Sequence, residues 1–197
     1  MHYLNIKKDE DRLSVVSEIA GFLQAGKVAV LPTDTIYGLS CLADDLTAIS
    51  KIYKLKYRQP NKPLIILVSS LSMARRYVRM TASQADMAAK FWEDSRRPTT
   101  LIFFDRGKLS FLSGSLALRL PKSSLLIKII KKIGRPIVST SLNISGQEEI
   151  KDLSQINKFW PDTDCQPDLI VNSGRSRAIK PSRLIDLRGQ KPVVLRK

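Results

Sequence analysis

Histidine and cysteine are scarce in this chain, and their scarcity argues against several kinds of active site. The 197 residues include one histidine, His2, and two cysteines, Cys41 and Cys165, which are far apart in the sequence. Because the chain has no Cys-x-x-Cys pair and no Cys/His cluster, we expect no zinc site. A Cys–His pair or a Ser–His–Asp triad would have to use His2, near a terminus of the kind that is commonly loosely ordered. Any chemistry should therefore use other side chains.

Long apolar segments are also absent. The N-terminus reads MHYLNIKKDEDRL, which lacks the apolar core of a secretory signal. The longest apolar runs are far shorter than the ~20 residues that cross a bilayer as a helix. We therefore expect a cytoplasmic protein with reduced thiols and no membrane partner.

Acidic residues are few, so the chain is strongly basic. It has 33 Lys and Arg residues against 18 Asp and Glu residues, a net charge of +15. This surplus predicts attraction to polyanions such as nucleic acids and nucleotides, although a generally basic proteome would give the same value. Apolar residues make up 43% of the chain, which is typical of a globular protein. We expect one domain over residues 1–197.

Apolar periodicity predicts alternating helices and strands. We predict helices over 9–25, 45–57, 70–78, 81–93, 122–133 and 152–160. Strands are predicted over 27–33, 63–70, 99–105, 116–121 and 136–141, with short C-terminal strands within 168–174, 183–188 and 192–197. Because strands and helices interleave, the fold class should be α/β, with a mixed sheet flanked by helices.

The stretch KIYKLKYRQPNKPLIILV, residues 51–68, places five basic residues ahead of a buried strand without an intervening acid. On the predicted helix, Lys51 and Lys54 point away from the apolar stripe and should form a solvated face. Lys56 lies on the apolar side, four residues after Ile52. A lysine there is unfavourable unless its ammonium group reaches water or meets an anion. Lys56 and Arg58 could therefore form an anion site, or could be a snorkelling lysine beside a helix-terminal arginine.

Two stretches rich in hydroxyl groups follow predicted strands. In LPTDTIYGLS, residues 31–40, Thr33, Thr35 and Tyr37 alternate and would share one face of an extended chain. STSLNISG, residues 139–146, offers backbone N–H groups and short donors to a phosphate or carboxylate. It lacks the lysine and spacing of a P-loop, and the chain has no G-x-G-x-x-G motif. Each stretch also suits an ordinary loop.

The C-terminal segment, residues 174–197, is basic as well, with Asp186 as its one acid. It predicts either a solvated surface or a rim that binds polyanions. Few aromatic residues accompany the charges, so stacking on unpaired bases is not indicated.

Taken together, these motifs resemble the YrdC-like family of threonylcarbamoyl-AMP synthases. PTDTIYGL is similar to the family's PT-(D/E)-T-x-YGL stretch, and LALRLP to its V-x-V-R-x-P strand. Lys56-Tyr57-Arg58 with Ser141-Leu142-Asn143 matches the K-x-R…S-x-N signature, and STSLNISG is similar to STSAN-x-SG. The resemblance spans residues 10–196 and is to the short form of the family. It implies a single-domain, YrdC-like twisted mixed sheet with a basic concave cleft.

The resemblance implies a nucleotidyltransferase that joins L-threonine, bicarbonate and ATP into threonylcarbamoyl-AMP and releases pyrophosphate. ATP would be a substrate, Mg²⁺ would assist, and no metal site of the protein's own is expected. A separate transferase complex would use the product to modify tRNA next to the anticodon. The alternative is a non-catalytic module on the same fold that binds tRNA or double-stranded RNA. A related domain that makes carbamoyl-AMP would accompany acylphosphatase and zinc-binding parts, which this chain lacks.

The family's site residues carry over to matching positions of this chain. The threonine pocket would consist of Thr35, Arg119, Ser139 and Ser182, with Arg119 pairing with the carboxylate. The catalytic signature would be Lys56, Arg58, Ser141 and Asn143. ATP would be bound by Arg58, Lys62, Ser115, Ser141 and Arg196.

The chain departs from the family pattern at two places near the expected substrates. Residues 96–100 read RRPTT, where the family usually carries P-G-P-x-T. Leu67 stands where the long-form enzymes have a histidine that helps bind threonine. Recognition of threonine should therefore differ in detail.

Overall fold

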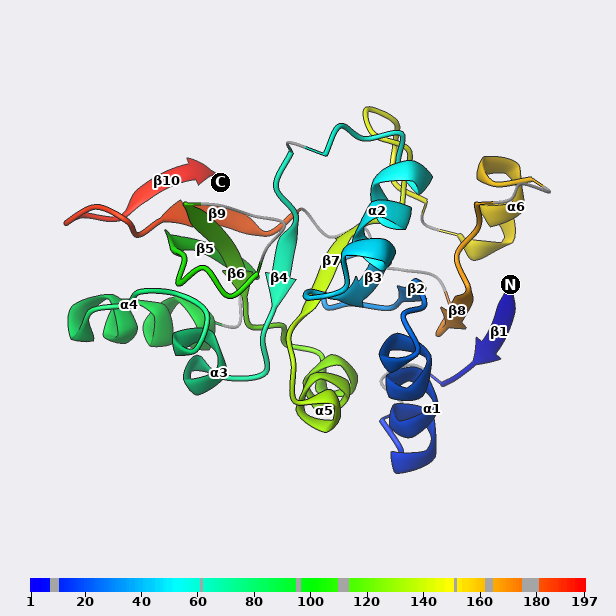
Figure 1. Ribbon diagram of the computed structural model, residues 1–197, viewed down its shortest axis with the longest axis horizontal. Helices are drawn as coiled ribbons and strands as arrows, with labels where there is room; N and C mark the ends of the chain where they lie inside the picture. Colours follow the sequence, from blue (N-terminus) through cyan, green and yellow to red (C-terminus); the bar gives the residue numbers. More distant parts are fainter. Residues whose placement is uncertain are drawn as a thin grey trace.

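One mixed sheet organises the chain. The structure, a computed structural model, describes residues 1–7, 11–60, 62–94, 97–109, 114–150, 152–161, 165–174 and 181–197. In this part of the chain a 10-stranded sheet has the order β1-β8-β2-β3-β7-β4-β6-β5-β9-β10. Figure 1 shows the two termini at opposite ends of this sheet.

The strands are short and pair in both directions. In chain order they are β1 (His2–Asn5), β2 (Ala29–Leu31), β3 (Gly38–Leu42), β4 (Ile65–Leu67), β5 (Thr99–Phe104), β6 (Ser115–Arg119), β7 (Ile137–Ser141), β8 (Leu169–Asn172), β9 (Arg183–Asp186) and β10 (Val193–Arg196). At the centre, β7 is antiparallel to both β3 and β4, and β4 is parallel to β6. The predicted mixed α/β sheet is confirmed.

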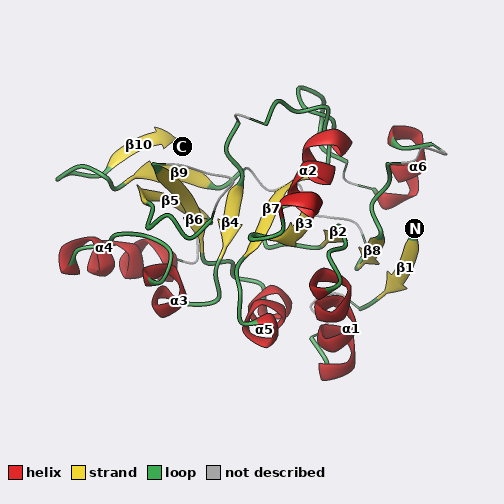
Figure 2. Cartoon of the chain, viewed as in Figure 1, coloured by secondary structure: helices red, strands yellow, loops and turns green. Residues whose placement is uncertain are grey.

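Helices cover the sheet. They are α1 (Leu13–Gln24), α2 (Leu46–Leu55), α3 (Leu71–Arg75), α4 (Ala82–Glu93), α5 (Ser124–Ile133) and α6 (Ile156–Phe159), the last preceded by a 3-10 turn, Leu153–Gln155. In the view of Figures 1 and 2, α1, α3, α4 and α5 lie below the strands, and α2 and α6 lie above them. Among the described residues, no helix combines the length and apolar character needed to cross a membrane.

Local chemistry sets where the helices begin and end. The Asp45 carboxylate accepts a hydrogen bond from the Ala48 N–H (2.9 Å) and starts α2. Thr81 and Gln84 form a capping box at the start of α4. Gly134 ends α5 with a positive φ of 74°, a conformation that glycine adopts without strain.

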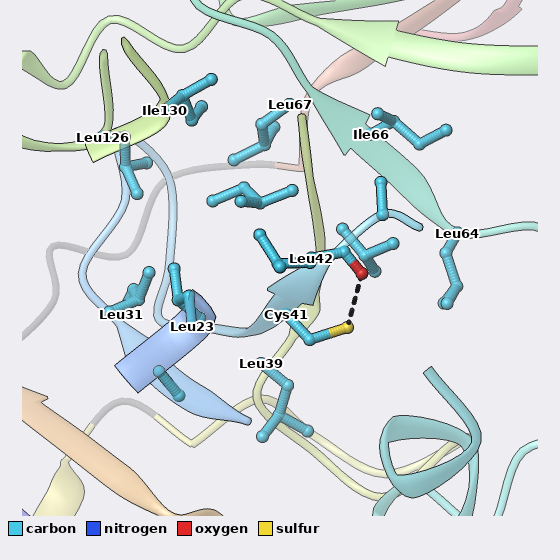
Figure 3. Packing of buried hydrophobic residues seen from close by; sticks show 14 of the residues in the cluster. Leu23, Leu31, Leu39, Cys41, Leu42, Leu64, Ile66, Leu67, Leu126 and Ile130 are labelled. Atoms are coloured by element: carbon cyan, nitrogen blue, oxygen red, sulfur yellow. Dashed lines mark hydrogen bonds between the residues drawn. The ribbon is translucent and has the colours of Figure 1, made fainter. Parts of the chain in front are cut away.

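The apolar core fills the space between helices and sheet. Leu23 of α1 and Leu126 and Ile130 of α5 are fully buried in one cluster with Leu42 and Leu67 of the sheet (Figure 3). In the same figure the Cys41 thiol donates to the carbonyl of Leu42 at 3.4 Å. The buried Cys41 is not part of a disulfide. This packing holds the strand ends that carry the polar residues described below.

Two strands are additional to those predicted. β1 pairs in parallel with β8, and the ring of His2 stacks on Phe22, so the expectation of a loose terminus is wrong. β3 starts at Gly38, within the stretch 31–40 for which we predicted no second strand, and pairs antiparallel with β2. The polar residues between the two strands conceal this hairpin in the sequence.

Smaller differences concern element ends and one lysine. The first helix starts at Leu13. Residues 9 and 10, where we predicted its start, lie outside the described residues. Lys51 is not simply solvated: its ammonium group forms an ion pair with Asp168 at 2.8 Å. Lys54, on the same helix, is exposed as expected.

Candidate functional site

A cavity of about 370 Å³ lies over the centre of the sheet. Its floor comes from neighbouring strands, because side chains that alternate along a strand share one face. Ile65 of β4 pairs with Ala117 of β6 and with Ser139 of β7, and all three line the cavity. In the next row, Leu67 pairs with Arg119. The floor is therefore apolar in the middle and polar towards the strand ends.

The turn that joins β2 to β3 forms one wall. The hydroxyls of Thr33 and Thr35 are 2.9 Å apart, and the Thr33 hydroxyl donates to the carbonyl of Ile36 at 2.7 Å. Residues 34–36 bend rather than extend, so the three alternating hydroxyls do not share a strand face. Thr33, Thr35 and Tyr37 nevertheless all line the cavity.

Tyr37 fastens this wall to a distant segment. Its hydroxyl donates to the carbonyl of Gly174 at 2.6 Å, accepts from the backbone N–H of Ser173 at 3.0 Å and lies 3.1 Å from the Ser173 hydroxyl. The side chain is 1% exposed. The turn of the PTDTIYGL motif is thus fixed against the end of β8.

Arg119 is buried at the end of β6 with one charged partner. Its Nη2 pairs with the carboxylate of Asp34 at 3.0 Å, and its Nη1 donates weakly to the Thr35 hydroxyl at 3.4 Å. Its Nε is buried without a hydrogen-bond partner. Burial lowers the pKa of the guanidinium, Asp34 opposes this shift, and Arg196 adds to it. An arginine stays protonated despite such a shift, so a buried cation faces the cavity with donor capacity to spare.

Lys56 lies under the cavity rather than in its lining. It is 1% exposed, and its ammonium group donates to the carbonyl oxygens of Ser141 (2.5 Å) and Asn143 (2.9 Å) and to the Asn143 side-chain oxygen (2.8 Å). Three donors meet three acceptors, so the group is saturated. Burial is the main cause that lowers the pKa of Lys56, to about 7. The lysine therefore holds the segment that follows β7.

The segment after β7 also forms hydrogen bonds to the end of α2 and between its own residues. The Ser145 N–H donates to the carbonyl of Lys56 at 2.9 Å, and the Ser141 hydroxyl donates to the Asn143 side-chain oxygen at 2.6 Å. Figure 1 shows the loops after α2 and after β7 rising together above the sheet. The K-x-R and S-x-N parts of the signature are thus in contact in the folded protein.

The backbone at Tyr57 turns sharply between Lys56 and Arg58. Tyr57 has a positive φ of 48° and is 75% exposed. This turn directs Lys56 inwards and Arg58 into the cavity lining. Arg58 donates from Nη2 to the carbonyl of Pro63 at 2.9 Å, while its Nε is buried without a partner. Burial lowers the pKa of Arg58.

The C-terminal strands close the far side. Arg196 of β10 donates from Nε and Nη2 to the carbonyl of Ser182, at 3.0 and 2.8 Å. The Ser182 hydroxyl lies 2.8 Å from that of Thr100. The basic segment predicted as a polyanion rim is described only in part, because residues 175–180 lie outside the described residues.

The structure brings most of the candidate residues to this cavity. The candidates in its lining are Thr35, Arg58, Arg119, Ser139, Ser141, Ser182 and Arg196. Lys56, Lys62, Ser115 and Asn143 are not in the lining. Lys62 is exposed, and Ser115 begins β6 at the end away from Arg119. The roles of all these residues remain predictions.

Sequence reasoning missed several residues of the site. Asp34, the partner of Arg119, stands beside Thr35 in the same motif, but nothing in the sequence pairs it with β6. Glu149 lines the cavity from the loop after β7, and no motif marks it. Leu67, the departure noted above, lies in the apolar floor, and Arg96 of the second departure lies outside the described residues.

The cavity lining is cationic and rich in hydroxyl groups. Three guanidinium groups and several hydroxyls line it, with no histidine or cysteine among its lining residues. In the part of the chain that the structure describes, no group of three or more His, Cys, Asp or Glu residues could hold a metal ion. The guanidinium and hydroxyl groups of the lining suit the binding and orientation of negatively charged substrates.

Comparison with known proteins is consistent with these motifs. The model of the Sua5/YciO/YrdC family, described as telomere recombination, matches residues 21–197. The threonylcarbamoyl-AMP synthase of Pyrococcus abyssi is 32% identical over 183 residues, which cover 90% of this chain and 52% of that protein. The threonylcarbamoyl-AMP synthase of Dichelobacter nodosus is 30% identical over 166 residues, covering 82% of this chain and 84% of that protein.

A solved structure supports the same relationship. The crystal structure of P. abyssi Sua5 complexed with L-threonine matches with a TM-score of 0.83 and 28% identity, covering 100% of this chain and 57% of that one. The chain thus spans about half the length of its P. abyssi relative. The family model covers most of the sequence, so the chain belongs to the Sua5/YciO/YrdC family, the YrdC-like family that its motifs resemble.

Proposed function

We propose that this protein is an L-threonylcarbamoyladenylate synthase, which makes threonylcarbamoyl-AMP and pyrophosphate from L-threonine, bicarbonate and ATP. The observation that carries the proposal is the cavity lined by Arg58, Arg119 and Arg196. Two of these side chains, Arg58 and Arg119, have a buried Nε without a partner. Buried donors left unpaired are unfavourable, so both are suited to an anionic ligand.

Arg119 is the proposed anchor for the carboxylate of threonine. A guanidinium already fixed by Asp34 at 3.0 Å is preorganised for a second, planar partner. Thr35, Ser139 and Ser182 would offer hydroxyls around the same ligand. Leu67 in the floor would contact the threonine methyl group instead of a polar atom.

Arg58, Ser141 and Arg196 are the proposed contacts of ATP, with Lys56 and Asn143 holding the loop that presents Ser141. Lys62 and Ser115 would have to reach ATP from outside the cavity lining. In the reaction bicarbonate first takes up a proton and loses water to give carbon dioxide, and the threonine amine adds to the carbon of carbon dioxide and loses a proton to give a carbamate. A carbamate oxygen then attacks the α-phosphorus, the bond to the β-phosphate bridging oxygen breaks, and pyrophosphate leaves. Orientation and charge neutralisation supply the catalysis, so no protein nucleophile is needed.

Mg²⁺ would neutralise charge on the ATP phosphates. The described residues contain no group of three potential metal ligands, so the ion would be held largely by the phosphates themselves, as Mg²⁺ commonly is in nucleotide enzymes. The product would pass to a separate complex that modifies tRNA.

Pyrophosphate release by the purified protein tests this proposal. We expect release from ATP only when both threonine and bicarbonate are present. Arg119→Lys should raise the KM for threonine far more than the KM for ATP, because the planar fork is lost. Release that needs neither threonine nor bicarbonate would contradict the proposal.

The net charge of +15 favours one second candidate, a non-catalytic RNA-binding module. The affinity of a diffuse basic surface for RNA falls only a little when two of its many charges are removed. On this alternative, salt-sensitive binding of double-stranded RNA would survive Arg58→Ala and Arg196→Ala together, two residues of the cavity lining, and no pyrophosphate would be released. Loss of turnover in the same double variant favours the enzyme.

A further inference from the structure

Glu149 stands out in the cavity because it is the one acidic residue among the described lining residues. Its side chain is partly buried. Within the described residues it makes no hydrogen bond and no ion pair, although three arginines line the same cavity. Its charge also acts on the buried ammonium group of Lys56, but the two groups form no ion pair. The carboxylate therefore has acceptor capacity left for a ligand.

Hydrogen bonds fix two residues close to Glu149: Gln147, two positions before it, and Ile150, directly after it. The side chain of Asn143 donates to the carbonyl of Gln147 at 2.7 Å, and the Ile150 N–H donates to the carbonyl of Leu142 at 2.9 Å. Ile150 is 3% exposed and belongs to the core. Glu149 is therefore presented by the same segment that Lys56 holds, at the Arg58 and Ser141 end of the cavity.

The charge of Glu149 limits what it can meet there. It repels phosphates and carboxylates, which the arginines attract. An ionised carboxylate accepts hydrogen bonds and does not donate them, so its partner in a bound nucleotide must be one of the nucleotide's donors, which are uncharged. The nucleoside part of ATP carries such donors, namely ribose hydroxyls and an exocyclic amine, and acidic side chains bind ribose hydroxyls in other nucleotide sites.

We propose that Glu149 is a specificity-determining residue that accepts a hydrogen bond from an uncharged donor of the nucleoside part of ATP. This inference rests on the proposed function, since it requires ATP in the cavity. It assigns opposite ends of the nucleotide to opposite charges: phosphates to the arginines, and a ribose hydroxyl or the amine to Glu149.

The test is nucleotide affinity, measured by calorimetry at fixed Mg²⁺ for the full chain. The ligands are ATP, 2′-deoxy-ATP, 3′-deoxy-ATP and purine riboside triphosphate, which lacks the amine. We expect one of the three analogues to bind the unmodified protein about tenfold or more weakly than ATP, the effect of losing a hydrogen bond to a charged acceptor. The analogue that binds more weakly than ATP lacks the group that donates the hydrogen bond to Glu149.

The Glu149→Ala variant should bind ATP about as weakly as the unmodified protein binds that analogue. It should also bind ATP and the analogue with equal affinity. The matched control is Glu148→Ala, which changes an exposed neighbouring acid outside the cavity lining and should keep the discrimination. The inference is overturned if all analogues bind the unmodified protein like ATP, or if Glu149→Ala retains the discrimination. It is also overturned if the variant changes only the Mg²⁺ concentration needed for binding. Failure of the unmodified protein to bind ATP at all would instead contradict the proposed function.

Discussion

Lys56 is the residue whose burial has the clearest measurable consequence. Burial, together with Arg58, lowers its pKa from 10.5 to about 7, while Glu149 acts in the opposite direction. Between these values the unfolded chain binds more protons than the folded protein at this site. The free energy of unfolding therefore rises with pH from about 7 upwards, by at most about 1.4 kcal/mol per pH unit. Below pH 7 the lysine is protonated in both states and contributes no slope.

We predict that Lys56→Met removes this rise. Denaturant unfolding between pH 7 and 8 measures it, because in this range the unfolded Cys41 thiol, with an ordinary pKa of 9.0, is still almost fully protonated. Burial raises the pKa of Cys41 from 9.0, so this thiol would lower stability at higher pH. Lys54→Met changes an exposed lysine of the same helix and should keep the slope. Equal slopes in Lys56→Met and the unmodified protein would contradict the assignment.

Tyr57 stores backbone strain beside Lys56. Its φ of 48° is unfavourable for a residue with a side chain, by about 1 kcal/mol or more. Tyr57→Gly should therefore be more stable than Tyr57→Ala by about 1 kcal/mol in chemical denaturation, because both lose the exposed ring and only glycine relieves the strain. If the alanine variant is the more stable, the strained turn is not present in solution.

Gly38 lets two strands approach closely at the cavity floor. A Cβ at this position would lie 2.6 Å from the Ser139 hydroxyl and 3.3 Å from the carbonyl of Thr140. Gly38→Ala should displace Ser139, lower stability by about 1–3 kcal/mol and weaken threonine binding measured by calorimetry. Gly21→Ala, in an open position of α1, should instead stabilise the protein by up to about 1 kcal/mol. Similar effects of the two substitutions would contradict the close approach.

At the scale of elements, β10 is an exposed edge strand. Val193, Val194 and Leu195 are each at least half exposed, and β10 ends the sheet order. Exposed apolar edges promote pairing between chains. Val194→Lys should therefore reduce self-association in light scattering. Leu13→Lys changes an exposed residue at the start of α1 and should have little effect. Equal behaviour of both variants would show that the edge is not responsible.

The elements also show which parts of the fold could be predicted from sequence. The periodic helices α2, α4 and α5 and the apolar strand β4 were predicted because their patterns are local. β3 was missed because polar turn residues lead directly into it, and β1 because it is short and begins at the second residue. The sheet order could not be predicted, since the pairing of β4 with both β6 and β7 joins residues far apart in sequence.

In the candidate site, too, some residues could be predicted from the sequence and some contacts could not. Thr35, Arg119, Ser139 and Ser141 were found because their motifs are contiguous. The pairing of Arg119 with Asp34, the saturation of Lys56 by residues 141–143 and the position of Glu149 depend on how distant segments meet. Such contacts carry no local sequence signal.

At the scale of the whole molecule, the sheet gathers cations from distant segments into one cavity. Arg58 follows α2, Arg119 ends β6 and Arg196 ends β10. The three come together because β4, β6, β5, β9 and β10 are neighbours in the sheet. The surplus charge of +15 extends beyond this cavity, so the affinity for anionic substrates should fall as salt increases.

Incorporation of a labelled carbon tests the proposed synthesis of threonylcarbamoyl-AMP most directly. The purified protein is incubated with ATP, L-threonine and ¹³C-labelled bicarbonate, and the products are analysed at once by mass spectrometry. We expect an adduct of AMP and threonine that carries one labelled carbon, together with pyrophosphate, and we expect no such adduct when threonine is omitted. ATP cleavage without a labelled adduct, or binding of ATP and threonine without any product, would contradict the proposed synthesis.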